Sequence, residues 1–152
     1  MASCDTGVSA VQLVTPEQIA AVMALAPAPH SFAELDEQVA EGLPKAALKA
    51  GVERLGRNAD ERRILLHRVV PEATFKRRRD RLSPAESEKT ERLARVYATA
   101  RHVWNSDEDA LAFLHAPHAM LGGQPPLEVA MTELGARRVE TLLWRLFYGI
   151  AA

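Results

Sequence analysis

Basic side chains are concentrated in the middle of the chain, where they could bind a polyanion. Four successive bases at residues 76–79 are followed by Arg81. Arginine and lysine side chains pair with phosphate oxygens and with guanine edges in the major groove of DNA. Residues 54–81 hold ten bases against four acids, a local charge of +6, whereas residues 1–42 hold six acids and no Lys or Arg. We therefore expect the middle of the chain to meet a polyanion and its ends to meet protein.

A helix over residues 72–81, opened by Pro71, must position these bases. On this helix Phe75 and the following Leu82 point into a core, while the opposite side faces outward. A preceding helix over residues 59–69 and a short turn complete a helix-turn-helix pattern, whose second helix enters the major groove. The alternative is a solvated basic face, which is what most charge runs are. The residues that we expect to bind DNA are Thr74, Lys76, Arg77, Arg78 and Arg81.

The last expected helix, over residues 136–149, has apolar side chains on two sides. One side follows the spacing of a core-facing stripe, which is made by Val139, Leu142, Leu143, Leu146, Phe147 and Ile150. Trp144 and Tyr148 lie one turn apart on the opposite side, beside Arg137. Aromatic side chains next to arginine are typical of a protein-binding surface. The alternative is that both aromatic residues cover another helix of the same domain.

Glycine and proline mark the breaks in the chain before this helix. A tight turn is expected at Gly122-Gly123, and a helix start at Pro125-Pro126. Three further glycines stand where the end of a helix favours a left-handed residue, namely Gly56, Gly135 and Gly149.

The sequence around these breaks contains recognisable motifs. It reads Leu121-Gly122-Gly123-x-x-Pro126, Thr132-Glu133-x-Gly135-x-x-x-Val139-Glu140-x-Leu142-Leu143 and Tyr148-Gly149. These motifs resemble the toxin-binding domain of the Xre/MbcA/ParS antitoxin family. The resemblance reaches back through Gly42-Leu43-Pro44, Phe75-Lys76-Arg77-Arg78 and Leu82-Ser83-x-x-Glu86-Ser87. The stretch Pro71-Glu72-Ala73-Thr74-Phe75 departs from the family pattern, which carries more Arg or Ser and a Leu there. This departure bears on the operator sequence rather than on the family.

The resemblance implies a function as the antitoxin of a type II toxin–antitoxin pair. The expected partner is a RES-domain toxin that consumes NAD+ and is bound by the terminal helix and the end at residues 149–152. The expected second partner is operator DNA, bound by a homodimer that represses its own operon within a larger toxin–antitoxin complex. The family's motif positions imply toxin contacts at Leu121, Pro126, Glu133, Arg137, Glu140, Arg145, Tyr148 and Gly149, and helical geometry adds Trp144. For Leu121, Pro126 and Glu133 the alternative is local folding of the loop and its helix cap.

The fold that we expect is all-α. Capping signals precede apolar periodic segments at Thr15, Ser31, Asn58, Ser83 and Ser106, and no segment shows the alternation of a half-buried strand. The expected helices span residues 16–25, 32–41, 44–55, 59–69, 72–81, 84–104, 107–115, 126–134 and 136–149. The expected domains are an N-terminal helical arm and possible dimerisation element (1–42), a helix-turn-helix region (43–82) and a C-terminal toxin-binding domain (83–152). The alternative for the arm is that it packs on its own chain's core.

Signals for catalysis and for cofactors are weak. His115 and His118, with His102 earlier in the chain, fit surface positions better than a metal site. The acids at residues 107–109 complement the dipole of a helix start. No phosphate-binding loop or nucleophile elbow is present, so we expect neither an enzyme nor a cofactor.

The remaining composition bears on where the protein works. Cys4 is alone, so an internal disulfide is excluded, and neither a signal peptide nor a long apolar run is present. We therefore expect a cytoplasmic protein with no membrane contact. Two rival functions stay open: a stand-alone helix-turn-helix repressor whose C-terminal half only dimerises, and a helical adaptor that binds protein and no DNA.

Overall fold

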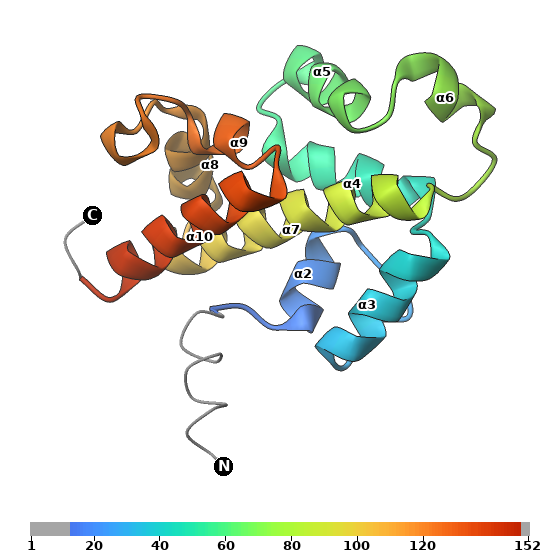
Figure 1. The fold of residues 1–152 in the computed structure, drawn as a ribbon, viewed down its shortest axis with the longest axis horizontal. Coiled ribbons are helices and arrows are strands. Elements are labelled where there is room, and N and C mark those ends of the chain that lie inside the picture. The colour runs from blue at the N-terminus through green and yellow to red at the C-terminus, as the bar shows by residue number, and fades with distance from the viewer. Residues whose placement is uncertain (1–12, 150–152) are drawn as a thin grey trace. The chain divides into compact units, whose positions relative to one another are not determined.

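The computed structural model describes residues 13–149, which form two compact units. One unit comprises residues 16–94, and the other comprises residues 95–149 with the short segment before Pro16. Figure 1 shows that both units are built from helices. Within the described part of the chain no β-strand forms, and the extended pairing consists of isolated bridges from Pro44 to Arg81 and from His118 to Gln124. The expected all-α class is confirmed.

The unit of residues 16–94 contains the first five helices described. They are α2 (Pro16–Val22), α3 (Phe32–Glu41), α4 (Lys45–Leu55), α5 (Ala59–Val69) and α6 (Glu72–Arg77), followed by the first half of α7 (Pro84–Trp104). Helix α2 packs on α3 and α4, and α4 packs on α5. Residues 16–42 therefore pack on the core of their own chain, through buried side chains that include Ile19, Met23, Leu35 and Val39.

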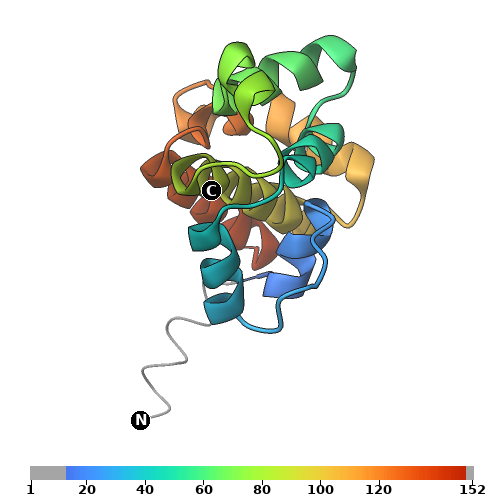
Figure 2. The ribbon, with the colours of Figure 1, turned by 90° about the vertical axis from the view of Figure 1, so that its right-hand side faces the viewer.

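Charge is distributed unevenly over this unit. Helices α5 and α6 lie on one side of it and α2 and α3 on the other in both views (Figures 1 and 2). The exposed charges of α3 are all acidic, namely Glu34, Asp36, Glu37 and Glu41. Helices α5 and α6 expose four bases, Arg63, Arg68, Lys76 and Arg77, against two acids, Asp60 and Glu72. The charge asymmetry along the sequence is thus also an asymmetry in space.

The unit of residues 95–149 begins with the second half of α7. It continues with α8 (Asp107–His115), the 3₁₀ helix η1 (Ala119–Leu121), α9 (Pro126–Val129) and α10 (Glu133–Phe147). Helix α9 packs against α8 and α10, and η1 packs against α10. The fully buried side chains of this unit include Val96, Tyr97, Leu114, Val139 and Leu143.

Side-chain caps start several helices, and the sequence predicted all of those described here except the cap at Thr132. The side chains of Ser31, Asn58, Ser106 and Thr132 each accept a hydrogen bond from the backbone N–H three residues later. Before α7 the cap is reciprocal, because Glu86 N–H donates to Ser83 Oγ at 3.1 Å and Ser83 N–H donates to Glu86 Oε1 at 2.8 Å. Each cap satisfies amide groups that the first turn of a helix leaves unpaired.

Four expected boundaries are wrong by three residues or more. Helix α2 ends at Val22 instead of residue 25. Helix α6 ends at Arg77, four residues before the expected end, and α9 ends at Val129 instead of residue 134. Helix α10 begins at Glu133, because Thr132 caps it one turn earlier than expected.

Two of the glycine interpretations also fail. Gly56 has a φ of −92°, and Gly135 lies inside the first turn of α10, so neither is a left-handed helix end. Gly149 has the expected positive φ, at 71°.

Candidate nucleic-acid interface and protein-binding helix

The basic helix α6 is held in place by the residues on either side of the turn that precedes it. Val70 and Val69 are buried, and Pro71 leads into the first turn of α6. Phe75, the buried residue of α6, anchors the helix in the core. Helix α5, the turn at residues 70–71 and α6 therefore form the helix-turn-helix arrangement that the sequence predicted.

The outward side of α6 presents two of the expected DNA-binding bases. Lys76 and Arg77 are exposed, and Thr74 is half-buried. Their contacts are short-range ones on the same helix: Lys76 Nζ lies 3.3 Å from Glu72 Oε2, and Arg77 Nη2 donates to Thr74 Oγ1 at 3.4 Å. The exposed ion pair of Lys76 contributes little energy, and the Thr74 hydroxyl carries no charge to neutralise Arg77, so both bases remain available to phosphates.

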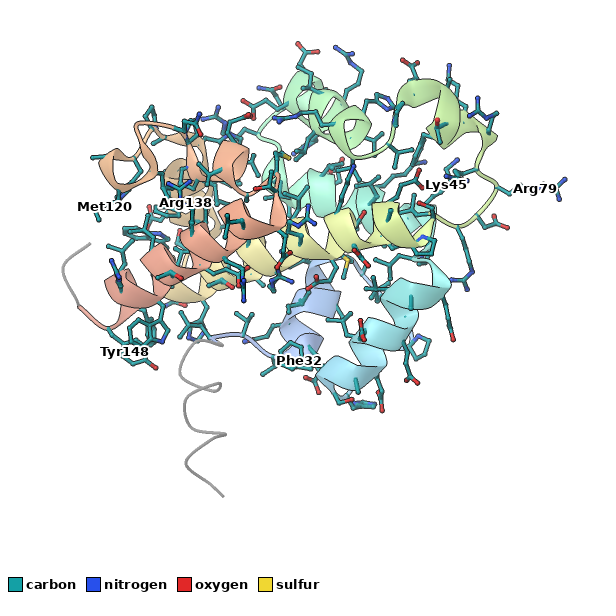
Figure 3. The ribbon with its side chains drawn as sticks, in the orientation of Figure 1. Phe32, Lys45, Arg79, Met120, Arg138 and Tyr148 are labelled. Carbon is teal, nitrogen blue, oxygen red and sulfur yellow. The ribbon has the colours of Figure 1, made fainter. Side chains whose placement is uncertain are left out.

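Arg78 and Arg81 lie beyond the end of α6, whereas the sequence predicted a helix that includes both, with Arg81 on its outward side and Arg78 at the edge of its buried side. Arg78 is half-buried and donates to both carboxylate oxygens of Glu86, at 3.2 and 3.0 Å. Arg81 donates from Nη1 to Gly42 O at 2.6 Å. Both arginines thereby tie the segment after α6 to the rest of its unit. Arg79 extends away from the ribbon in Figure 3 and is exposed.

The ion pair of Arg78 also changes the titration of its partner. Burial raises the pKa of the Glu86 carboxyl, but hydrogen bonds from Arg78 and Ser83 outweigh burial and hold the pKa below its ordinary value of 4.5. The same hydrogen bond shifts the pKa of Arg78 in the opposite direction and raises it, because it favours the charged guanidinium. Glu86 therefore stays ionised at neutral pH and stabilises both the start of α7 and the loop after α6.

Two lysines of α4 lie beside the anchor of α6, and the sequence interpretation missed them. Lys45 Nζ lies 4.2 Å from the centroid of the Phe75 ring and donates to Arg78 O at 3.0 Å. Lys49 Nζ lies 5.7 Å from the same centroid. The signal available in the sequence was their spacing of four residues at a helix start, which places them on one face. They were missed because they precede the window of densest positive charge.

Helix α10 has one buried face and one exposed face. Its buried residues are Gly135, Ala136, Val139, Leu142 and Leu143. Its exposed residues include Leu134, Arg137, Arg138, Thr141, Arg145 and Tyr148 at its end. The exposed fraction is 68% for Leu134 and 55% for Tyr148. An amphipathic helix whose outer face carries arginine and an aromatic residue is suited to binding another protein.

Family comparisons assign both parts of the chain. A model of the antitoxin Xre-like helix-turn-helix domain matches residues 34–95, and a model of the antitoxin Xre/MbcA/ParS C-terminal toxin-binding domain matches residues 99–149. The chain belongs to the Xre/MbcA/ParS antitoxin family. It combines a helix-turn-helix domain with a toxin-binding domain, which supports an antitoxin role with a toxin and DNA as partners. No curated protein shows a significant match to this antitoxin.

Within the toxin-binding domain, the two acids of α10 serve the fold. Arg95 of α7 donates from Nε to Glu140 Oε2 at 2.8 Å, and its Nη2 lies 3.4 Å from Glu133 Oε1. The side chains of Arg95 and Glu140 are exposed by only 17% and 15%. The carboxylate of Glu140 is thus committed to an ion pair, contrary to its expected place on the binding surface. Glu133 is exposed and lies next to the cap of α10.

The aromatic residues at the end of α10 form a cluster that is partly open to solvent. Trp144 and Tyr148 stack with ring centroids 4.9 Å apart, Phe147 contacts Tyr148 edge-on at 5.1 Å, and His102 packs on Phe147 at 5.0 Å. Tyr148 is exposed as expected, but Trp144 is half-buried and its Nε1 has no hydrogen-bond partner among residues 13–149. Phe147, expected in the core stripe, is 44% exposed. Ile150 and the end at residues 150–152 lie outside the described residues.

The turn at residues 118–124, which precedes α9, accounts for the other motif residues of the toxin-binding domain. Gly122 and Gly123 have φ values of 68° and 79°, which glycine adopts without strain. Gly123 N–H donates to His118 O at 2.9 Å and so closes the turn. Leu121 and Pro126 are buried, which favours the alternative that they serve the local fold over the expected toxin contact. Gly149 is exposed.

The candidate metal and catalytic residues have structural roles in the antitoxin. Met120 N–H donates to His118 Nδ1 at 3.0 Å, which caps η1. Asp107 accepts from Tyr97 Oη at 2.8 Å and from Arg101 Nε at 2.9 Å. Across residues 13–149 no three His, Cys, Asp or Glu side chains gather as metal ligands, and no candidate membrane-spanning helix is found there.

Proposed function

We propose that this antitoxin neutralises a RES-domain toxin, which consumes NAD+ and is encoded beside it, by binding it directly through residues 99–149. In the same proposal the helix-turn-helix domain binds the operator of the shared operon as a homodimer and represses it. A dimer suits this use because operators present paired half-sites, roughly 34–36 Å apart along the duplex. The proposed function requires no catalytic group in the antitoxin itself.

The observation that carries the proposal is the exposed face of α10 within the toxin-binding domain. Tyr148 is 55% exposed at the end of this helix, while Val139 and Leu143 anchor the opposite face in the core. A helix that is anchored in the core on one side and exposes an aromatic residue on the other provides a preformed binding surface. The RES identity of the partner is supported by the resemblance of the Leu121-Gly122-Gly123 and Tyr148-Gly149 motifs to the family pattern.

Co-expression with the neighbouring gene tests neutralisation. The wild-type antitoxin is expected to restore growth, and Tyr148→Asp is expected to reduce the rescue, because a carboxylate replaces the aromatic contact. Lys89→Asp is the control, since it introduces the same carboxylate at an exposed site on α7 in the other unit. Point substitution is preferable to deletion of residues 136–152, which would also remove the core residues Val139, Leu142 and Leu143. Failure of the wild type to restore growth would refute neutralisation.

The chemistry of the toxin needs its own readout. The co-purified complex is expected to be inactive towards NAD+, and hydrolysis of NAD+ is expected once the two proteins have been separated. A partner that harms the cell without consuming NAD+ would retain the antitoxin role but refute the RES assignment.

Fluorescence anisotropy with promoter DNA tests repression. Binding is expected to weaken steeply as salt rises, because phosphate contacts release counterions. A salt-independent signal, or no signal at all, would favour an adaptor that binds protein and no DNA.

A further inference from the structure

We propose that the toxin surface that contacts α10 is acidic and has an apolar area at each of its two ends. The contacting surface of the antitoxin, here called the arginine face, consists of Leu134, Arg137, Arg138, Thr141, Arg145 and Tyr148. This inference rests on the proposed function and specifies the chemistry of the partner.

Helical geometry places these residues on one side of α10. At 100° per residue the arginine face covers an arc of about 100°, centred opposite Val139 and Leu143. Arg138 and Arg145 lie seven residues apart, which is about 10 Å along the axis at 1.5 Å per residue. Leu134 and Tyr148 bound the face at its two ends, about 20 Å apart. Arg138 and Tyr148 are labelled in Figure 3.

The three arginines of this face carry positive charge that the described residues do not neutralise. Arg137, Arg138 and Arg145 make no ion pair or side-chain hydrogen bond within residues 13–149. The carboxylates of α10 itself, Glu133 and Glu140, both contact Arg95 instead. Because both carboxylates of α10 contact Arg95, neither forms an ion pair with the arginine face in the described part of the chain.

Uncompensated guanidinium groups restrict what can cover this helix. A neutral or basic surface that covered them would remove water from three charges and return no ion pair, which is costly. Carboxylates on the partner restore the lost solvation through paired hydrogen bonds, and they also accelerate association by attraction at a distance.

The apolar ends favour an acidic protein over DNA as the occupant. Leu134 is 68% exposed and Tyr148 is 55% exposed, and Phe147 next to Tyr148 is 44% exposed. A phosphate backbone offers these side chains nothing to pack against, whereas a protein surface can bury them. An acidic polypeptide with apolar contacts at both ends fits the whole face.

Association kinetics of the full-length antitoxin with the purified product of the neighbouring gene test the inference. We expect the association rate to fall at least tenfold between low and high salt, and roughly tenfold or more on Arg138→Glu with Arg145→Glu. Lys89→Glu reverses one charge outside the toxin-binding domain, which is half of the change in the double variant, and is expected to leave the rate within about twofold. Circular dichroism of each variant establishes that it is folded.

Each other outcome has a defined meaning. Association of the wild type that ignores salt, together with unchanged binding of the double variant, overturns the acidic surface and leaves the proposed function standing. Absence of association by the wild type overturns both. Loss of operator affinity in the double variant, with toxin binding unchanged, would assign the arginine face to DNA and overturn the inference.

Discussion

Single atoms decide where this chain tolerates a side chain, and its glycines show this most directly. An added Cβ at Gly135 would lie 1.7 Å from Val129 O, whereas at Gly51 it would meet nothing within 4 Å. Gly135 lets α10 start directly against the end of α9. Gly51 lies inside α4, where glycine weakens a helix without any packing benefit.

The same substitution at these two glycines is therefore expected to have opposite effects. Gly135→Ala should destabilise the toxin-binding unit by about 3 kcal/mol or more, because the backbone carbonyl of Val129 must move. Gly51→Ala should stabilise the helix-turn-helix unit by roughly 0.5–1 kcal/mol. Chemical denaturation of the two variants and the wild type measures both. Equal effects of the two substitutions would contradict the role given to Gly135.

Glu86 is expected to make stability depend on pH. Its folded-state pKa lies below 4.5, so its contribution is complete above pH 4.5 and is lost as the pH falls through the lowered pKa. Glu86→Gln should therefore be less stable than the wild type at pH 7, and the difference should shrink towards pH 3. Thermal unfolding across this range measures the difference, and Glu88→Gln, at an exposed site two residues away, is the control. A difference that persists undiminished at pH 3 would refute the ion-pair explanation.

At the scale of elements, α6 shows how a short helix is held by others. Phe75 is the buried residue of α6. Lys45 of α4 contacts both the Phe75 ring and the carbonyl of Arg78. Arg78 and Arg81 then bind Glu86 and the carbonyl of Gly42. Six helical residues form no stable helix by themselves, so these contacts give α6 its position.

Lys76 and Arg77 are the bases that this arrangement presents for DNA. The double variant Lys76→Ala with Arg77→Ala should weaken operator binding and reduce the slope of log affinity against log salt by about 2. Anisotropy titrations at several salt concentrations measure the slope, and Lys89→Ala, on α7, is the control. An unchanged slope would mean that another surface contacts the phosphates.

At the scale of the molecule, two compact units carry two separate surfaces. Helix α6 belongs to the unit of residues 16–94, and α10 belongs to the unit of residues 95–149. The proposed surfaces share no residue, and the family comparisons divide the chain in a similar way, at residues 34–95 and 99–149.

Separable surfaces predict separable functions. The variant Lys76→Ala with Arg77→Ala should lose operator affinity and still rescue growth, whereas Arg138→Glu with Arg145→Glu should lose rescue and still bind the operator. Operator binding and growth rescue are both measured for each of the two variants. Joint loss of both activities in variants that remain folded would show that the two functions depend on one surface.

The sequence alone determined the class of the fold and most of its helices. Local signals sufficed, because a capping side chain and an apolar period act within one or two turns. Ser31, Asn58 and Ser106 cap their helices as predicted, and the predicted turn forms at Gly122-Gly123, where both glycines have a positive φ. The charge asymmetry and the family motifs were also apparent in the sequence.

Only the tertiary structure decided which charged residues are free. Arg78, Arg81 and Glu140 belong to motifs that predicted binding, yet each contacts a residue at least eight positions away in the sequence. Arg137, Arg138 and Arg145 look the same in sequence but make no such contact within the described residues. A side chain's partner across the fold depends on how distant segments pack, and helical periodicity contains no information about that packing.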